Sequence, residues 1–280
     1  MPKISVTSYN SAWPQFFKAT ATKLQQVLAE QCKEIHHIGS TAIPGMAAKP
    51  IIDIVAVVPS LIEAIEPIKS TGLTFRGENI IPLHLYFKQE YADYSVNLHV
   101  YEPDNTSIKL HLCFRDYLRQ APALVAQYSQ LKYKLAGDLA KHQKQKVGLT
   151  GYNLGKDQFI QEVIRLTDFQ GVYLRFCLHN KEWQQYRKIW QEYNNSHELN
   201  CDFTKSRTMH YHFVLYSGME IIAIAAVAAK EKLIYVYGVD SARSKMHSLL
   251  VKWMELQPKL SGYIDEKAKS SSFMMAANCI

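Results

Sequence analysis

The chain has 280 residues, of which 48% are hydrophobic and 20% are charged, and its formal net charge is +7. At roughly 150 residues per domain this length predicts about two domains, and the composition excludes a disordered chain. The modest positive charge is compatible with a phosphate-bearing ligand but does not demand nucleic acid, and the basic residues are spread over both halves. We therefore expect no specific nucleic-acid partner.

Cysteine usage and the apolar runs indicate a compartment. The longest apolar run, residues 221–229, is too short to cross a bilayer, and the first residues lack an apolar core of signal-peptide length. The five cysteines are odd in number and include no Cys-x-x-Cys pair, which argues against a disulfide framework or a zinc knuckle. We expect a protein of the reducing cytoplasm that binds no membrane.

Hydrophobic spacing predicts alternating helices and strands in the first half. In chain order we expect a helix from about residue 10 to 31, a strand at 51–58, a helix at 61–70, strands at 83–87 and 94–101, a helix at 115–143 that Pro122 could break, and a helix at 156–166. Residues 36–50, rich in glycine, proline and small side chains, are expected to form a loop.

A second set of elements follows a break near residues 167–172. We expect a strand at 172–178, a helix at 182–193, strands at 210–216, 220–228 and 233–237 with a hairpin turn at 216–219, and a helix at 244–256. The predicted fold is two units of α+β or α/β type in series, with domains at 1–168 and 172–280.

Asp53 lies inside an apolar strand, between Ile52 and Ile54. An ionised carboxylate buried without a partner costs several kcal/mol, so a cation or a lysine nearby is expected. The alternative is a structural carboxylate that hydrogen-bonds to backbone at the end of a strand. The strand by itself leaves both interpretations open.

A Gly39-Ser40-Thr41 turn precedes this strand. Glycine lets the backbone approach a ligand closely, and the hydroxyl and N–H groups of such a turn can hold phosphate. A Gly-Ser turn followed by a strand that carries an acid is the layout of a nucleotidyltransferase core, in which the turn binds the triphosphate and the acids bind a divalent metal.

Five stretches resemble the GrpB family, also called UPF0157, and together they cover essentially all of residues 1–166. They are YNSAWPQFF at 9–17, HHIGSTAIPGMAAKPIIDIV at 36–55, NLHVY at 97–101, FRDYLRQAPALVAQYSQLKYKLA at 114–136 and YNLGKDQFI at 152–160. The resemblance implies a fold of the nucleotidyltransferase superfamily, a mixed sheet with helices. It also implies functional roles for Gly39, Ser40, Thr41, Lys49, Asp53, His99, Arg115 and Lys132.

Within that pattern, Asp53 would be the first acid of an Asp-x-Asp pair and the ligand of Mg²⁺ or Mn²⁺. Val55 occupies the position of the second acid, which puts two-metal chemistry in doubt. Asn97, His99 and Tyr101 alternate with apolar residues and would share one face of their strand. If the strand at 94–101 lies beside the strand at 51–58, His99 would lie near Asp53 as a metal ligand or general base. A hydrogen-bonded core histidine is the alternative.

Lys49, Arg115 and Lys132 are expected phosphate or nucleotide contacts, since arginine offers a bidentate fork and lysine a point charge. Solvated helix positions are the alternative for Arg115 and Lys132.

The second half is similar to GNAT acyltransferases in its order of strand, helix, hairpin, strand and helix. The resemblance implies an acetyl-CoA site along the strand that carries Val236 and Gly238 and in the next loop, with Arg243 and Lys245 near the pyrophosphate. Ser244 and Met246 stand where that family has glycines, and the chain after residue 261 shows little strand signal. We therefore expect a degenerate or truncated GNAT-like domain.

Three functions remain open at this point. The first is a nucleotidyltransferase-like enzyme that uses a divalent metal, and the second is a GNAT-type N-acetyltransferase that uses acetyl-CoA. The third is a non-catalytic protein that binds a nucleotide, another phosphate-bearing small molecule or a protein partner. The sequence names neither a substrate, nor a protein partner, nor an oligomeric state.

Overall fold

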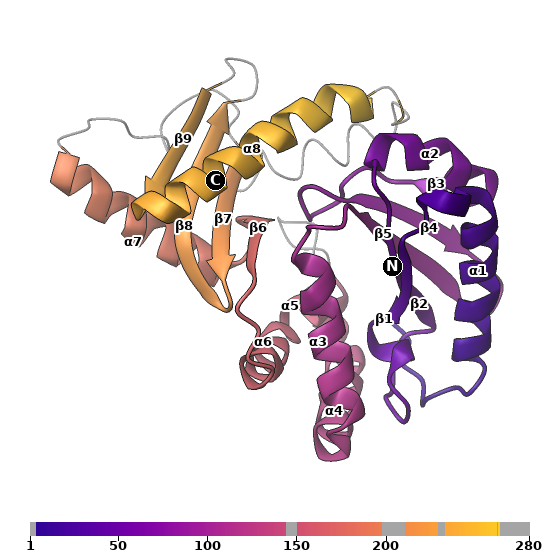
Figure 1. Cartoon of the computed structure of the whole chain (residues 1–280). Helices are drawn as coiled ribbons and strands as arrows, with labels where there is room; N and C mark the ends of the chain where they lie inside the picture. The colour runs from indigo at the N-terminus through magenta and orange to yellow at the C-terminus, as the bar shows by residue number, and fades with distance from the viewer. Residues whose placement is uncertain (1–3, 144–149, 198–210, 229–232, 262, 264–280) are drawn as a thin grey trace. The chain divides into compact units, whose positions relative to one another are not determined.

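A computed structural model describes residues 4–143, 150–197, 211–228, 233–261 and 263 (Figure 1). The described residues divide into two compact units. The first contains the residues up to 77, 84–143 and 150–169, and the second contains 78–83 and the residues from 170 onward. Among the described residues, no helix is long and apolar enough to span a membrane.

The first unit is built on a mixed sheet with the strand order β1-β2-β5-β4-β3. Its described strands are β1 (Glu34–Ile38), β2 (Ile51–Val57), β3 (Thr74–Phe75), β4 (Leu85–Glu90) and β5 (Ser95–Tyr101). The central pair β2 and β5 is parallel, and the other pairs are antiparallel. The predicted mixed sheet is therefore present, and β1 is an addition, since residues 36–50 were expected to form a loop.

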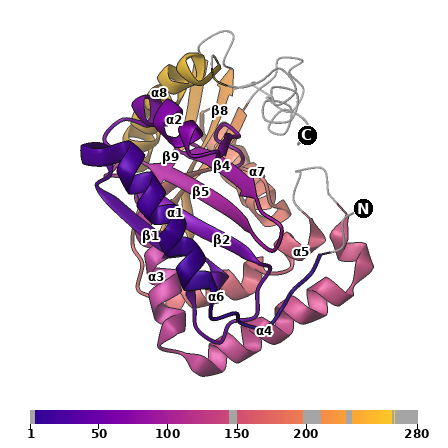
Figure 2. The ribbon, with the colours of Figure 1, turned by 90° about the vertical axis from the view of Figure 1, so that its right-hand side faces the viewer.

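Helices cover both faces of this sheet. They are α1 (Trp13–Leu28), α2 (Leu61–Ser70), α3 (Ser107–Arg119), α4 (Pro122–Gly137), α5 (Gly151–Leu154) and α6 (Asp157–Leu166). Figures 1 and 2 show α1 lying across one face of the sheet and α3 to α6 on the other side. The expected helix at 115–143 is divided before Pro122, and its first part begins earlier, at Ser107.

The apolar pattern of β2 fixes which side chains face the core. Ile52 and Ile54 are fully buried, and side chains alternate across a strand, so Asp53 points to the opposite face. On α1, Trp13, Leu24 and Leu28 recur at helical spacing and are buried. The apolar side of α1 packs on the face of the sheet that carries Ile52 and Ile54. The helices α3 to α6 therefore cover the opposite face, which carries Asp53.

The second unit has an antiparallel sheet with the order β6-β7-β8-β9. Its elements are β6 (Val172–Phe176), α7 (Asn180–His197), β7 (Tyr211–Ser217), β8 (Glu220–Ala228), β9 (Leu233–Gly238) and α8 (Asp240–Ser261). Phe213 and Leu215 of β7 pack with Met246 and Trp253 of α8 in one apolar core. A degenerate or truncated GNAT-like domain was expected because residues 265–280 show little strand signal, and these residues lie outside the described part of the chain.

Residues 78–83 pack with the second unit although they lie between β3 and β4 in sequence. Leu83 joins its apolar core. The buried carboxylate of Glu78 accepts hydrogen bonds from the Leu83 N–H at 2.6 Å, the indole N–H of Trp253 at 2.8 Å and the amide of Gln257 at 2.7 Å. Burial raises the pKa of Glu78 to about 7, although these hydrogen bonds oppose the shift.

Candidate functional site

The Gly39-Ser40-Thr41 turn directly follows β1 and lies against Asp53 of β2. In the antiparallel register Ile38 is opposite Asp53, so Gly39 is the first residue past that pair. Gly39 has a φ of 69°, and a β-carbon placed on it would come 2.5 Å from Asp53 Oδ2. Glycine is therefore required at residue 39 both for its backbone conformation and for the space that the carboxylate occupies.

Thr41 fixes the shape of this turn. Its side chain is 1% exposed, and its hydroxyl donates to the Ile51 carbonyl oxygen at 2.9 Å. Nε2 of His37 lies 3.0 Å from the same hydroxyl. Because the hydroxyl proton is already donated to Ile51, His37 Nε2 must be the donor in that bond. Thr41 was predicted to contact phosphate, and the structure uses its hydroxyl to join the turn to β2.

The carboxylate of Asp53 contacts Asn97 of the neighbouring parallel strand. Asp53 and Asn97 are register partners, and Asn97 Nδ2 donates to Asp53 Oδ1 at 2.9 Å. Tyr86 of β4 in turn donates its hydroxyl to Asn97 Oδ1 at 2.8 Å. Burial raises the pKa of Asp53 to about 6, against the opposing effects of the Asn97 hydrogen bond and of the charges of Lys156 and Lys49.

Three lysines from separate segments lie around this carboxylate and the adjoining Gly-Ser turn. Lys49 precedes β2, Lys132 lies on α4, and Lys156 is the residue that precedes α6. Lys132 Nζ donates to Ser40 Oγ at 3.0 Å, which connects α4 to the Gly-Ser turn. We call Lys49, Lys132 and Lys156 the lysine cluster.

Two buried tyrosine rings hold the ammonium groups of the lysine cluster. Lys49 Nζ and Lys156 Nζ lie 4.5 Å and 4.7 Å from the centroid of the Tyr152 ring, and Lys132 Nζ lies 4.4 Å from that of Tyr128. Such cation–π contacts restrict where the ammonium groups can lie. None of the three lysines forms an ion pair with a carboxylate within the described part of the chain.

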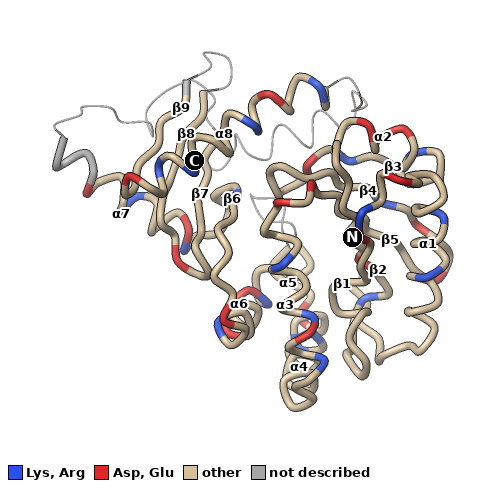
Figure 3. Tube along the Cα trace, in the orientation of Figure 1, with Lys and Arg blue, Asp and Glu red and all other residues tan. Residues whose placement is uncertain are grey.

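The cluster carries more positive charge than one carboxylate offsets, and the pKa values reflect this. Burial and the nearby charge of Lys156 lower the pKa of Lys132 to about 7. Burial and the charge of Lys49 lower the pKa of Lys156 to about 8, with Asp53 opposing, and burial also lowers the pKa of Lys49. Elsewhere in both units, lysine and arginine positions are interspersed with acidic positions (Figure 3). The three lysines are far apart in the sequence, so they come together because the fold packs their segments side by side.

The residues around Asp53 do not fit a preformed metal site. No group of three or more His, Cys, Asp or Glu side chains with a suitable arrangement occurs among the described residues. Val55, at the position of the second acid, is fully buried, and the polar neighbours of Asp53 are an amide donor and ammonium groups. A divalent ion prefers oxygen ligands and would add charge to an already cationic site.

Asn97, not His99, occupies the place beside Asp53. The register of β2 and β5 puts His99 opposite Val55, two residues further along the strand. Its Nδ1 lies 3.3 Å from His84 Nε2, and its ring packs near those of His84, Tyr86 and His111. Burial and the charges of His84 and His111 hold the pKa of His99 well below 6.5, so the His99 imidazole is neutral near pH 7. Its catalytic role stays a prediction.

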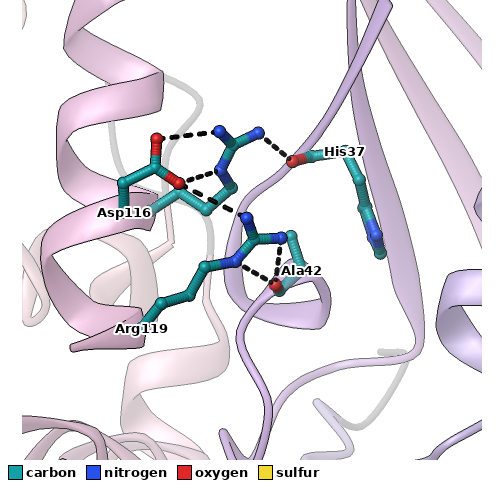
Figure 4. Close-up of polar contacts among 5 residues, drawn as sticks. His37, Ala42, Asp116 and Arg119 are labelled. Atoms are coloured by element: carbon teal, nitrogen blue, oxygen red, sulfur yellow. Dashed lines mark hydrogen bonds and ion pairs between the residues drawn. The ribbon is translucent and has the colours of Figure 1, made fainter. Parts of the chain in front are cut away.

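Two arginines of α3 hold the backbone around the Gly-Ser turn (Figure 4). Arg115 Nη1 donates to the His37 carbonyl oxygen at 3.0 Å, while its Nε and Nη2 bind the two carboxylate oxygens of Asp116. Arg119 donates to the Ala42 carbonyl oxygen from Nε at 3.0 Å and from Nη2 at 2.9 Å. Arg115 was predicted to bind phosphate. In the structure one of its three bonds supports the backbone before the turn and the other two bind Asp116, while Arg119 supports the backbone after the turn.

In the second unit the expected acetyl-CoA residues lie around the β9–α8 junction. Val236 and Gly238 are in β9, which pairs with β8 along its whole length. A β-carbon on Gly238 would come 2.7 Å from the Ile222 carbonyl oxygen, so this glycine has a packing role. Arg243 pairs with Asp240 in the first turn of α8, and Lys245 is exposed. Met246, at a position where the GNAT family has glycine, is buried in the core.

Together, the fold and the site define an α/β protein with a cationic site at a Gly-Ser turn, next to a carboxylate on the adjacent strand. The chain belongs to the GrpB family, since the family profile described as "GrpB protein" matches residues 3–166. The match covers the first unit up to the end of α6.

Named relatives agree with this assignment. UPF0157 protein YqkA of Bacillus subtilis (strain 168) is 40% identical over 57% of this chain, and a UPF0157 protein of Halalkalibacterium halodurans is 32% identical over 58% of this chain and 81% of its own length. The alignment spans only 46% of YqkA.

Solved structures give the same result for the fold. The crystal structure of conserved protein GrpB from Enterococcus faecalis matches with a TM-score of 0.50 and 34% identity, over 58% of this chain and 96% of that one. The Cid1 poly(U) polymerase matches at 11% identity with a TM-score of 0.39, over 54% of this chain and 48% of that one, which is too low to carry an argument.

Sequence reasoning missed Asn97, Tyr152 and Lys156 as members of the site. Asn97 lies in the polar set of the predicted strand at 94–101, two residues before His99. Tyr152 and Lys156 belong to YNLGKDQFI, one of the five stretches that resemble the family. Their presence in a family stretch was a usable signal, but no spacing rule connected them to Asp53.

Proposed function

We propose that the first unit is a nucleotidyltransferase-like module that binds a phosphate-bearing small molecule, such as a nucleotide, at the Gly39-Ser40 turn and the lysine cluster. The observation that supports this most directly is the convergence of three lysines, without an ion-paired carboxylate among the described residues, on Ser40 and Asp53. Like charges held close together in a partly buried site repel each other, and an anionic ligand would relieve that repulsion.

The turn itself supports a phosphate ligand. A backbone of glycine followed by serine can approach a phosphate oxygen closely. Ser40 is partly exposed, and its Oγ accepts a hydrogen bond from Lys132 Nζ. Arg115 and Arg119 stiffen the same turn through its flanking carbonyl oxygens. A turn held in place before the ligand arrives loses less entropy on binding.

Transfer of a nucleotidyl group is what the family resemblance implies, and it remains a proposal beyond binding. Asp53 is the acidic side chain that we place at the site, with a pKa of about 6. We assign no step through a protein-held metal ion, because the donor set around Asp53 does not fit one. The alignment spans less than half of YqkA, so the activity of a whole relative is likewise not transferred to this chain.

The test is a thermal-shift panel on the full chain with ATP, GTP, CTP, UTP and inorganic pyrophosphate, each with and without Mg²⁺ or Mn²⁺. A ligand that binds the folded state raises the melting temperature by mass action. We expect a shift with at least one phosphate ligand that Ser40→Ala reduces, while the exposed Ser70→Ala on α2 keeps it. No shift with any of these ligands would refute the proposal.

For the second unit, an acetyl-CoA-dependent acyltransferase is the further candidate. It is supported by the order strand, helix, three strands and helix that the GNAT resemblance predicts. Asp240 in the first turn of α8 disfavours a pyrophosphate at that helix end. Adding CoA and acetyl-CoA to the same panel tests it, since a shift with these two alone would favour the second unit.

We also propose a cytoplasmic location. In the described part of the chain, Cys32 and Cys113 are free thiols, as suits a reducing compartment. Fractionation of cells that carry the tagged chain tests this, and recovery from an oxidising compartment would contradict it.

A further inference from the structure

The lysine cluster occupies the surroundings in which a two-acid site would hold divalent metal. Asp53 supplies one carboxylate, and the position of the second acid is the buried apolar side chain of Val55. The charges of Lys49 and Lys156 both act on Asp53, and Lys156 acts on Lys132. Lysine side chains therefore supply positive charge at the place where a two-acid site would bind a metal ion.

The charge count indicates the class of ligand. With every group ionised, three ammonium groups and one carboxylate give a net charge of 3 − 1 = +2. A terminal phosphate has a second pKa near 6, so it is largely dianionic at neutral pH. One dianionic phosphoryl group would neutralise the site without any additional cation.

The ammonium groups are also positioned in advance. Lys132 is 2% exposed and is held between the Tyr128 ring and Ser40 Oγ. Lys49 and Lys156 share the ring of Tyr152, which is itself 1% exposed. Little side-chain entropy remains to be lost when an anion binds, which favours binding by this fixed set of charges.

We propose that Lys49, Lys132 and Lys156 replace the divalent metal at this site, so that it binds the terminal dianionic phosphate of its ligand without Mg²⁺ or Mn²⁺. This inference rests on the proposed function, because it specifies how the same site holds its ligand. Ser40 donates or accepts a hydrogen bond at the phosphate, and Lys132, bonded to Ser40, lies closest to the turn.

Isothermal titration of the full chain with ATP and with inorganic pyrophosphate tests this, once in EDTA and once in Mg²⁺. We expect the Kd in EDTA to exceed the Kd in Mg²⁺ by at most about 3-fold, which corresponds to a difference in binding free energy of less than 1 kcal/mol. Lys156→Gln and Lys132→Met should each weaken binding in EDTA by about 10- to 100-fold, the usual effect of losing a charged hydrogen bond. Lys134→Ala, an exposed position on α4 with the same loss of charge, is the control and should stay within about 2-fold.

The outcomes separate the two proposals. Binding that requires Mg²⁺ would overturn the metal-independent site while leaving phosphate binding intact. Binding in EDTA that neither lysine variant weakens would also overturn it, because the charge would then come from elsewhere. No binding under either condition would refute the proposed function itself. If buried Lys132→Met does not fold, as judged by circular dichroism, the partly exposed Lys156→Gln and Lys49→Gln decide the result.

Discussion

Gly39 and Asp53 are packed so closely that residue 39 has no room for a side chain. A β-carbon on Gly39 would lie 2.5 Å from Asp53 Oδ2 and 3.1 Å from Asp53 Cγ. The contact follows from the register of β1 and β2, in which Ile38 is opposite Asp53 and the chain turns immediately afterwards. It connects the expected phosphate turn to the carboxylate that lies next to the lysine cluster.

Gly39→Ala should destabilise the first unit by more than the backbone strain of a positive φ at alanine would cause. A left-handed conformation costs a non-glycine residue about 1–2 kcal/mol, and the clash with Asp53 should add roughly 1–3 kcal/mol. Gly45→Ala is a matched control, since Gly45 also has a positive φ, of 77°, but a β-carbon there would meet no atom within 4 Å. Thermal melting of both variants measures the difference, and equal losses of stability would contradict the packing argument.

Asp53→Asn should change how stability depends on pH. The folded-state pKa of about 6 is higher than the ordinary 3.8, so the folded state holds the proton more tightly than the unfolded state. The contribution of Asp53 is therefore fully present below about pH 4 and is lost as pH rises through 6, by up to about 3 kcal/mol. Asp53→Asn should gain stability relative to the natural chain between pH 4 and 7.5 in urea titrations, and a constant difference over this range would contradict the prediction.

Ligand binding should take up protons near neutral pH. The groups that face one another here are Lys49, Asp53, Tyr86, Lys88, Tyr128, Lys132, Tyr152 and Lys156. An anion raises the pKa of Lys132 from about 7 and of Lys156 from about 8, so affinity should fall as pH rises through this range. Titrations of pyrophosphate in Hepes and in Tris give the proton count from the difference in heat. Lys132→Met should reduce the uptake, and proton release would be the opposite of the expected result.

Arg115→Ala should lower the stability of the first unit. The substitution leaves the His37 carbonyl oxygen without its charged donor, which costs about 1–3 kcal/mol, and it releases Asp116. Arg115→Lys should restore little, because one ammonium group cannot reproduce the three bonds of the guanidinium. The exposed Arg165→Ala on α6 is the control. Unchanged melting together with weakened pyrophosphate binding would instead support the phosphate contact predicted from the sequence.

Glu78→Ala should destabilise the second unit. It removes the acceptor of the buried Trp253 indole N–H, at a cost of about 1–3 kcal/mol for a buried donor left without a partner. Melting followed by tryptophan fluorescence reports mainly on this unit, which contains three of the four tryptophans. The control is Glu255→Ala, an exposed position on α8 of the same unit, which is expected to cost less than about 1 kcal/mol. Equal effects of the two variants would refute the assigned role of Glu78.

The strong local patterns of the sequence predict real elements. The continuous apolar run at 51–58, the helix at 61–70 and the break at Pro122 all correspond to elements of the structure. Strand β1 was missed because His36 and His37, adjacent to a stretch of glycine, proline and small residues, have the composition of a loop. Pairing with β2 supplies the hydrogen bonds that make this segment a strand, and no local pattern contains that partner.

By itself, then, the sequence determined the family stretches, the Gly39-Ser40 turn, the acid at residue 53 and the missing second acid. Only the tertiary structure decided that Asn97 is the register partner of Asp53 and His99 that of Val55, since the parallel pairing of β2 and β5 fixes both pairs. It also decided that Arg115 binds backbone, that Lys132 reaches Ser40 and that the charge of Lys156 acts on Asp53. The reason is physical: a local pattern encodes which face of an element is apolar, whereas the position of a charge depends on how distant elements pack together.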